Sequence, residues 1–128
     1  NLFGAQVLTS GNKIILGAGE YKLDLSSEYA EIIKKHNITD ISVGIRPEDM
    51  HDEEVFINDH AAWCIPAHVD ITEAMGSETF LYLTTDETSY VARVNPRTMA
   101  RTGNDITIAM DATKIHIFDK ETEVAVMN

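Results

Sequence analysis

The sequence contains a single cysteine, Cys64, so no disulfide bond can form within the chain. Disulfides mark proteins of oxidising compartments, and their absence here favours the cytoplasm. No apolar run approaches the ~20 residues that a membrane-spanning helix needs. Any association with a membrane is therefore expected to go through another protein.

Basic residues are also scarce. Ten Lys and Arg stand against 21 Asp and Glu, which gives a formal charge of -11. Such a charge repels the phosphate backbone of nucleic acids and the surface of anionic lipids. The composition therefore argues against nucleic acid as a partner. Hydrophobic residues at 44% and charged residues at 24% are typical of a folded domain.

The motifs that bind nucleotides and metals are missing. None of the seven glycines belongs to the Gly-x4-Gly-Lys-Ser/Thr pattern whose amides cradle phosphates. Gly17-Ala18-Gly19 begins a dinucleotide-like pattern, but position 22 is Lys and a hairpin or bulge explains the glycines better. No His pair has the His-Glu-x-x-His spacing, and the acidic run after His51 is interpreted as a solvated loop with at most weak cation affinity. We therefore expect no cofactor and no metal in this chain.

Candidate catalytic groups have simpler structural interpretations. Cys64 could combine with His68 and Asp70 in a nucleophilic site, but its neighbour Trp63 favours a buried thiol. Glu73, Glu78 and Asp86 could supply a pair of carboxylates for acid–base catalysis. Acidic residues are so frequent in this chain that such a pair is weak evidence for a catalytic site. Three aromatic residues are interpreted as cross-strand packing and not as a base-stacking platform: Phe80, Tyr82 and Tyr90. We predict that the chain is not an enzyme.

What the sequence does contain is a series of short β-strand patterns separated by turn residues. Strands are predicted over 6–9, 13–16, 21–25, 41–45, 67–71, 79–84, 90–94, 105–109, 114–118 and 124–127. One helix is predicted over 26–36, and the apolar island Val55 to Ile57 predicts an edge strand. About ten strands and one helix favour a mostly β protein, a small barrel or a sandwich.

No linker composition or internal repeat divides the chain. We expect a single domain over residues 1–128, with two β lobes as an open alternative. Because the first residue is Asn1 and not methionine, we expect the chain to be part of a longer protein whose preceding segment holds the activity.

Three segments carry a resemblance to a known family. They are Gly44-Ile45-Arg46-Pro47-Glu48-Asp49, Met75-Gly76-Ser77-Glu78-Thr79 and His116-Ile117-Phe118-Asp119. In this order they resemble the C-terminal, transport-associated OB-type domain of the ATP-binding subunits of maltose-type and multiple-sugar ABC importers. The opening Asn1-Leu2-Phe3-Gly4 resembles the segment by which that family leaves its nucleotide-binding domain.

The resemblance implies an OB-like fold of small β-barrels and a regulatory, dimer-stabilising role. It implies that ATP and Mg²⁺ bind in the longer parent protein and not in this chain. The implied partners are the parent's own N-terminal ATPase domain, a second copy of the subunit, the importer's membrane subunits, and a transcription regulator or sugar-phosphotransferase protein. The implied location is cytoplasmic, at the inner face of the plasma membrane.

Two motifs supply the candidate interface residues. Arg46 is a forked donor beside the rigid Pro47, suited to a carboxylate of a neighbouring domain or to Glu48 itself. In the second motif, Gly76 is expected to adopt a positive φ angle. The candidate interface comprises Arg46, Pro47, Glu48, Gly76, Ser77 and Glu78. Each motif also has a structural interpretation in place of an interface. Arg46 could form an internal salt bridge that holds a strand end, and the Gly76 motif could be an ordinary turn.

Two other functions stay open. Relatives with this class of domain include molybdate-binding forms, so an OB-type barrel that binds an oxyanion or a sugar phosphate is the alternative. The acid excess and the lack of a Ser-Ala-Arg-Asn type motif count against it. A nucleic-acid-binding OB module is disfavoured by charge.

Overall fold

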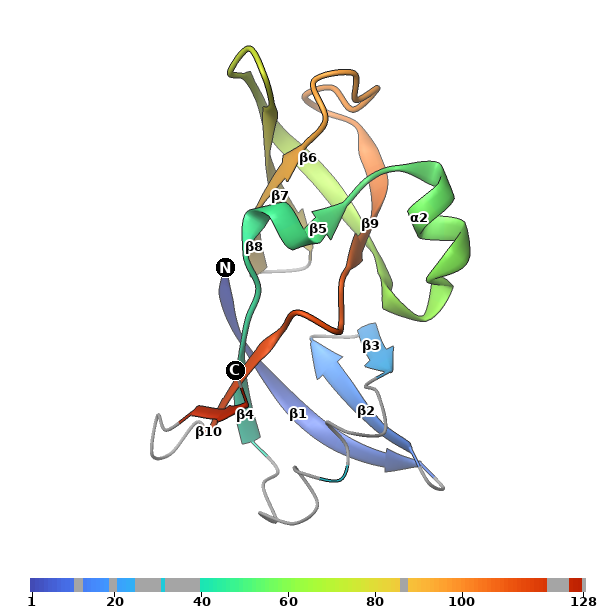
Figure 1. Ribbon diagram of the computed structural model, residues 1–128, viewed down its shortest axis with the longest axis vertical. Coiled ribbons are helices and arrows are strands. Elements are labelled where there is room, and N and C mark those ends of the chain that lie inside the picture. Colours follow the sequence, from blue (N-terminus) through green and yellow to red (C-terminus); the bar gives the residue numbers. More distant parts are fainter. Residues whose placement is uncertain are drawn as a thin grey trace. The chain divides into compact units, whose positions relative to one another are not determined.

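The computed structural model describes residues 1–10, 13–18, 21–24, 31, 40–85, 88–119 and 125–127, and the side chains of residues 1–2, 31, 41–85 and 88–119. The chain forms two compact units. Unit 1 comprises Asn1 and Arg46–Asp111, and unit 2 comprises Leu2–Ile45 and Ala112–Asn128. Each unit contains one antiparallel sheet (Figure 1).

The sheet of unit 2 has six described strands. Their order across the sheet is β11 (Ala125–Met127), β10 (His116–Asp119), β4 (Asp40–Gly44), β1 (Leu2–Ser10), β2 (Lys13–Ala18) and β3 (Tyr21–Asp24). β1 and β2, which contain the first two predicted strands, pair antiparallel with Ser10 opposite Lys13. In β4 and the residue after it, Ile41, Val43 and Ile45 are buried and alternate with half-buried neighbours, as expected of a strand with one buried face, and this confirms the strand predicted over 41–45.

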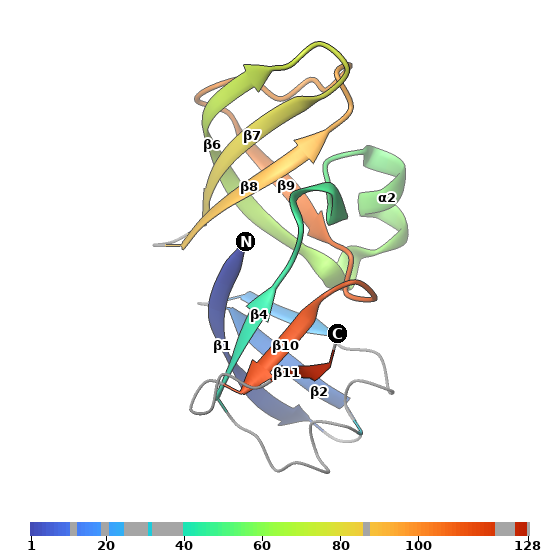
Figure 2. The same ribbon diagram turned by 60° about the vertical axis from the view of Figure 1, so that its left-hand side comes forward.

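The sheet of unit 1 has five described strands. Their order is β5 (Met50–His51), β9 (Asp105–Met110), β6 (Cys64–Ala74), β7 (Thr79–Thr85) and β8 (Thr88–Val94), and Figure 2 shows β6, β7 and β8 side by side. β7 buries every second residue from Thr79 to Thr85. In β9 the last three residues, Ile108 to Met110, are all buried. Helix α2 (Glu54–Asp59) and the turn η2 (Ala61–Trp63) contact β9. These contacts cover part of β9 from solvent.

The predicted edge strand from Val55 to Ile57 is wrong, because these residues lie in α2. In this helix Phe56 stacks on one aromatic ring that precedes the helix and on one that follows it. The Phe56 ring lies 4.1 Å from the His51 ring and 4.3 Å from the His60 ring, and His60 follows Phe56 by one helical turn. Val55 leaves its side chain 74% exposed, so the apolar island does not form a buried row.

Most other predicted elements are confirmed within a few residues. The strand β5 was not predicted, because two residues are too few to show a period. The predicted helix over 26–36 falls outside the described residues except for Glu31, whose backbone is helical. Gly76 has the predicted positive φ angle, 85°, and Gly103 also has a positive φ angle, 91°. No helix in the described part of the chain is long and apolar enough to cross a bilayer.

Candidate functional site

Arg93 joins two of the sequence motifs within unit 1. Its Nε atom lies 3.0 Å from Oε2 of Glu78, and one of its terminal nitrogens lies 3.6 Å from Oε2 of Glu48. The three side chains are 36–42% exposed, so water screens both ion pairs and each contributes little to stability. Their structural effect is to tie the Arg46–Asp49 segment to the Met75–Glu78 turn.

The first segment is placed by a tight turn. Pro47 begins the 3₁₀ turn η1 (Pro47–Asp49), where its missing N–H costs nothing. Arg46 precedes it with extended backbone angles, φ -76° and ψ 149°, and its carbonyl accepts a 3.0 Å hydrogen bond from the Asp49 amide. This turn places the carboxylate of Glu48 within reach of Arg93.

The second segment is a reversal between β6 and β7. The Met75 amide donates to the Glu78 carbonyl at 2.8 Å, and the Ser77 amide donates to the Met75 carbonyl at 3.2 Å. Gly76 supplies the positive φ that this reversal requires. Gly76 and Ser77 are exposed at the tip, whereas Glu78 turns back and is held by Arg93.

The six predicted interface residues therefore lie in two segments that Arg93 connects, but Arg46 does not hold Glu48. The Arg46 side chain is exposed and has no ion pair with any described residue. Sequence reasoning missed Arg93. The pairing of β7 with β8 could have indicated this contact. In that hairpin Arg93 lies opposite Phe80, and Phe80 is only two residues after Glu78.

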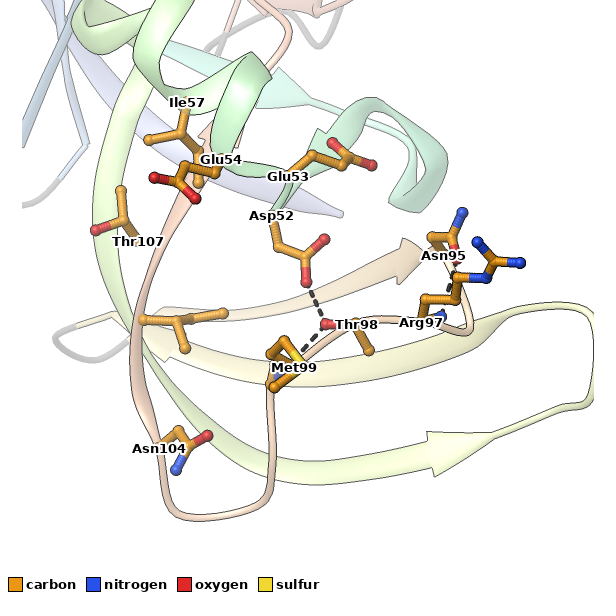
Figure 3. Close-up of a pocket in the computed structure, with 12 residues that line it drawn as sticks. Asp52, Glu53, Glu54, Ile57, Asn95, Arg97, Thr98, Met99, Asn104 and Thr107 are labelled. Atoms are coloured by element: carbon orange, nitrogen blue, oxygen red, sulfur yellow. Dashed lines mark hydrogen bonds between the residues drawn. The ribbon is translucent and has the colours of Figure 1, made fainter.

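A pocket of about 560 Å³ lies elsewhere in unit 1 (Figure 3). One wall comes from the segment that leads into α2, with Asp52, Glu53, Glu54 and Ile57; the facing wall comes from the β8–β9 connection, with Arg97 and Met99. The cavity was not predicted, because its two walls are about forty positions apart in the sequence.

Asp52 is the polar centre of this pocket. The Thr98 hydroxyl donates a hydrogen bond to Oδ2 of Asp52, and the Ala100 amide donates to the Thr98 hydroxyl at 3.1 Å. Burial raises the pKa of the Asp52 carboxyl, and the negative charge of Glu53 raises it further, against the lowering effect of the Thr98 hydrogen bond. The carboxylate is therefore held in surroundings that disfavour its charge.

The other chemical candidates do not assemble into a site. The Cys64 thiol donates to the His60 carbonyl at 3.3 Å, and burial raises the pKa of the thiol. His68 pairs with Asp105 at 2.8 Å, and Asp70 accepts from Thr84. Cys64, His68 and Asp70 therefore contact different partners and do not form a nucleophilic site together. His51 pairs with Glu53 at 3.3 Å, and the described residues contain no group of three His, Cys, Asp or Glu side chains that could hold a metal ion.

Comparison with known proteins identifies the class. The solved structure of the cytoplasmic molybdate-binding protein ModG covers 91% of this chain and 94% of its own at a TM-score of 0.68 and 13% identity, which shows a common fold. The predicted mostly β, OB-like fold class is confirmed. The TOBE domain model matches residues 43–118, and the chain belongs to this family.

Several ATP-binding proteins contain a similar sequence. The oligosaccharides import protein MsmX of Bacillus subtilis is 37% identical over 87 residues, which is 68% of this chain and 24% of MsmX. The multiple sugar-binding transport protein MsmK of Streptococcus mutans is 36% identical over 65% of this chain and 22% of its own length. The ABC transporter protein YcjV of Escherichia coli is 35% identical over 82% of this chain and 28% of its own length. The chain spans about a quarter of the length of these relatives.

Proposed function

We propose that this chain is the regulatory domain of the ATP-binding subunit of a carbohydrate ABC importer and that it stabilises the dimer of that subunit. The observation that carries the proposal is the TOBE domain match over residues 43–118 together with relatives named for sugar import. The domain itself hydrolyses no ATP. ATP and Mg²⁺ bind to an ATPase domain of the same protein.

The contact surface that we propose consists of the two segments connected by Arg93. Arg93 holds Glu48 and Glu78 in place, which leaves the forked guanidinium of Arg46 and the tip at Gly76 and Ser77 directed to a partner. A planar guanidinium without an internal carboxylate is suited to bind one across an interface. The partner at this surface is the ATPase domain or a second copy of the subunit.

The importer's membrane subunits and a transcription regulator or sugar-phosphotransferase protein complete the set of proposed partners. The location that follows is cytoplasmic, at the inner face of the plasma membrane and attached through the transporter complex. The charge of -11 agrees with attachment through protein, since anionic lipid would repel the chain.

The test uses the whole protein that contains this chain, in a strain that lacks its own copy. We expect Arg46→Ala to lower ATP-dependent sugar uptake or weaken dimerisation while the thermal midpoint stays unchanged. Lys114→Ala is the matched control, because Lys114 is an exposed cation remote in sequence from the proposed surface. Uptake and assembly that equal those of the wild type in Arg46→Ala would overturn the proposed surface, and a whole protein that drives no sugar uptake would overturn the importer assignment.

The second candidate function is the binding of an oxyanion or a sugar phosphate, which the fold shared with ModG favours. The described pocket does not support it, because three carboxylates and one guanidinium line the walls. Molybdate, sulfate or phosphate at 100 times its dissociation constant would stabilise the chain by about 2.7 kcal/mol. A thermal midpoint that rises with any of these anions would favour this second function.

A further inference from the structure

The pocket beside α2 has walls of a particular charge and polarity. Asp52, Glu53 and Glu54 supply three carboxylates, and Arg97 supplies the one cationic side chain of the lining (Figure 3). The lining also contains apolar side chains, those of Ile57, Met99 and Ile106. A ligand that fits both parts carries a positive group at the end of an aliphatic stem.

The position of Asp52 adds an energetic reason for a cation. Burial disfavours the charge of this carboxylate, and Glu53 beside it adds a like charge. A positive group in the pocket would offset both costs, because it would interact with a carboxylate that is already partly removed from water. Thr98, which donates to Asp52, holds the carboxylate in position for such a contact.

Met99 indicates the size of the partner. It lines the pocket, yet its side chain is 85% exposed, so the apolar surface continues outward beyond the cavity. A small amine bound at the carboxylates would leave the exposed part of Met99 in water, whereas a polypeptide segment is large enough to cover both. Methionine is unbranched and polarizable, and it adapts to apolar side chains of a peptide.

We propose that this pocket binds an Arg or Lys side chain of a partner protein, with a neighbouring apolar residue of the same segment covering Met99. The aliphatic stem of the basic residue packs on Ile57 and Ile106, and its head binds Asp52 and Glu54. The charge of -11 attracts a basic segment from a distance and raises its association rate. This proposal names the chemistry of a partner for the proposed regulatory domain, but it does not depend on sugar import.

The test is a titration of the isotopically labelled chain with three probes, followed by NMR. The probes are the peptide Ac-Ala-Leu-Arg-Leu-Ala-NH2, its counterpart with Glu in place of Arg, and free agmatine, which has the same guanidinium head. We expect the Arg peptide to shift the Met99 methyl and Thr98 amide signals and to bind about tenfold more tightly than the Glu peptide and than agmatine.

Charge variants locate the site. Asp52→Asn and Glu54→Gln keep the shape of the pocket and are each expected to weaken the Arg peptide about five- to tenfold. Glu73→Gln removes the same charge from an exposed residue outside the pocket and is expected to leave binding unchanged. Raised salt should weaken binding to the wild type.

Four results would overturn the proposal. They are equal binding of the Arg and Glu peptides, agmatine binding as tightly as the Arg peptide, the same loss of binding in Glu73→Gln as in Glu54→Gln, and no shift at Met99 at millimolar peptide. Shifts at Met99 that grow with protein concentration alone would assign the pocket to a second copy of the chain instead. None of these measurements uses transport, so their failure is distinguishable from failure of the proposed function.

Discussion

The side-chain amide of Asn1 pairs with the backbone of Val91 in both directions. Nδ2 of Asn1 donates to the Val91 carbonyl at 2.8 Å, and the Val91 amide donates to Oδ1 of Asn1 at 2.7 Å. Among the described strands β8 is the last of its sheet, so Val91 would otherwise expose these groups at an edge. A single side chain thereby replaces one residue of a neighbouring strand.

Removing this amide should loosen the edge of β8. Asn1→Ala loses both hydrogen bonds, and we expect a loss of about 1–2 kcal/mol in local stability. The amide proton of Val91 should then exchange with solvent about five- to thirtyfold faster. Asn58→Ala, at an exposed position of α2, is the control and should leave that rate unchanged. An unchanged Val91 rate in Asn1→Ala would show that water replaces the amide at no cost.

The two ion pairs of Arg93 should differ in strength. Double-mutant cycles with Glu78→Gln and Glu48→Gln against Arg93→Ala are expected to give coupling energies of about 0.2–1 kcal/mol. The Glu78 pair should give the larger value, because its atoms are 3.0 Å apart and those of the Glu48 pair are 3.6 Å apart. Both couplings should fall in high salt. A larger coupling to Glu48 would contradict the observed geometry.

Asp52 should make the chain less stable as the pH rises. Its pKa is raised in the folded state by burial, so between the unfolded value of 3.8 and the raised value the folded protein holds a proton that the unfolded chain has released. The stabilisation is complete below that window and is lost as the pH rises through it. The asparagine in Asp52→Asn carries no titratable group. We therefore expect the free energy of unfolding of this variant, relative to that of the wild type, to increase from about pH 3 to about pH 7.

Thr98 provides the matched variant for this measurement. Its hydrogen bond lowers the pKa of Asp52, so Thr98→Val should raise that pKa further and steepen the loss of stability with pH. The measurement is the denaturant midpoint of each variant across the pH range. Parallel curves for the wild type and Asp52→Asn would show that Asp52 is fully hydrated in solution.

Gly76 should be replaceable only at a cost in backbone strain. A Cβ at this position would meet no atom within 4 Å, so any loss comes from the φ of 85°. We expect Gly76→Ala to cost about 1–2 kcal/mol, and Gly76→Asn to cost less because asparagine tolerates this region. Denaturant unfolding measures both. Equal stability of the Ala and Gly forms would mean that the turn readily adopts a second conformation.

The core of unit 1 should depend on β7. Leu81 is 0% exposed, and Leu81→Ala is expected to destabilise unit 1 by about 2–5 kcal/mol through lost burial and a residual cavity. Ile71 is 55% exposed, so Ile71→Ala should cost less than about 1 kcal/mol. Comparable losses in the two variants, measured by thermal or denaturant unfolding, would contradict the burial of β7.

Much of the fold could be predicted because its signals are local. Ile41, Val43 and Ile45 alternate with polar or small residues, and a strand with one buried face requires that period. The turn at Gly76 has a residue that tolerates positive φ. Helix α2 was missed because its cause is not local: Phe56 stacks on His51 as well as on His60, and His51 is fixed by the pairing of β5 with β9.

The candidate site, like the fold, could be predicted from the sequence only in part. The sequence by itself determined most strands of the described chain, the turn at Gly76 and the motifs that indicate its family, because neighbours two to four residues apart produce those signals. Only the tertiary structure decided that Arg93 and not Arg46 binds Glu48, that Asn1 closes the edge at Val91, and that Asp52 faces Thr98 in a pocket. The physical reason is that strand register and the packing of α2 fix these contacts between residues far apart in the sequence, and no short pattern contains that register.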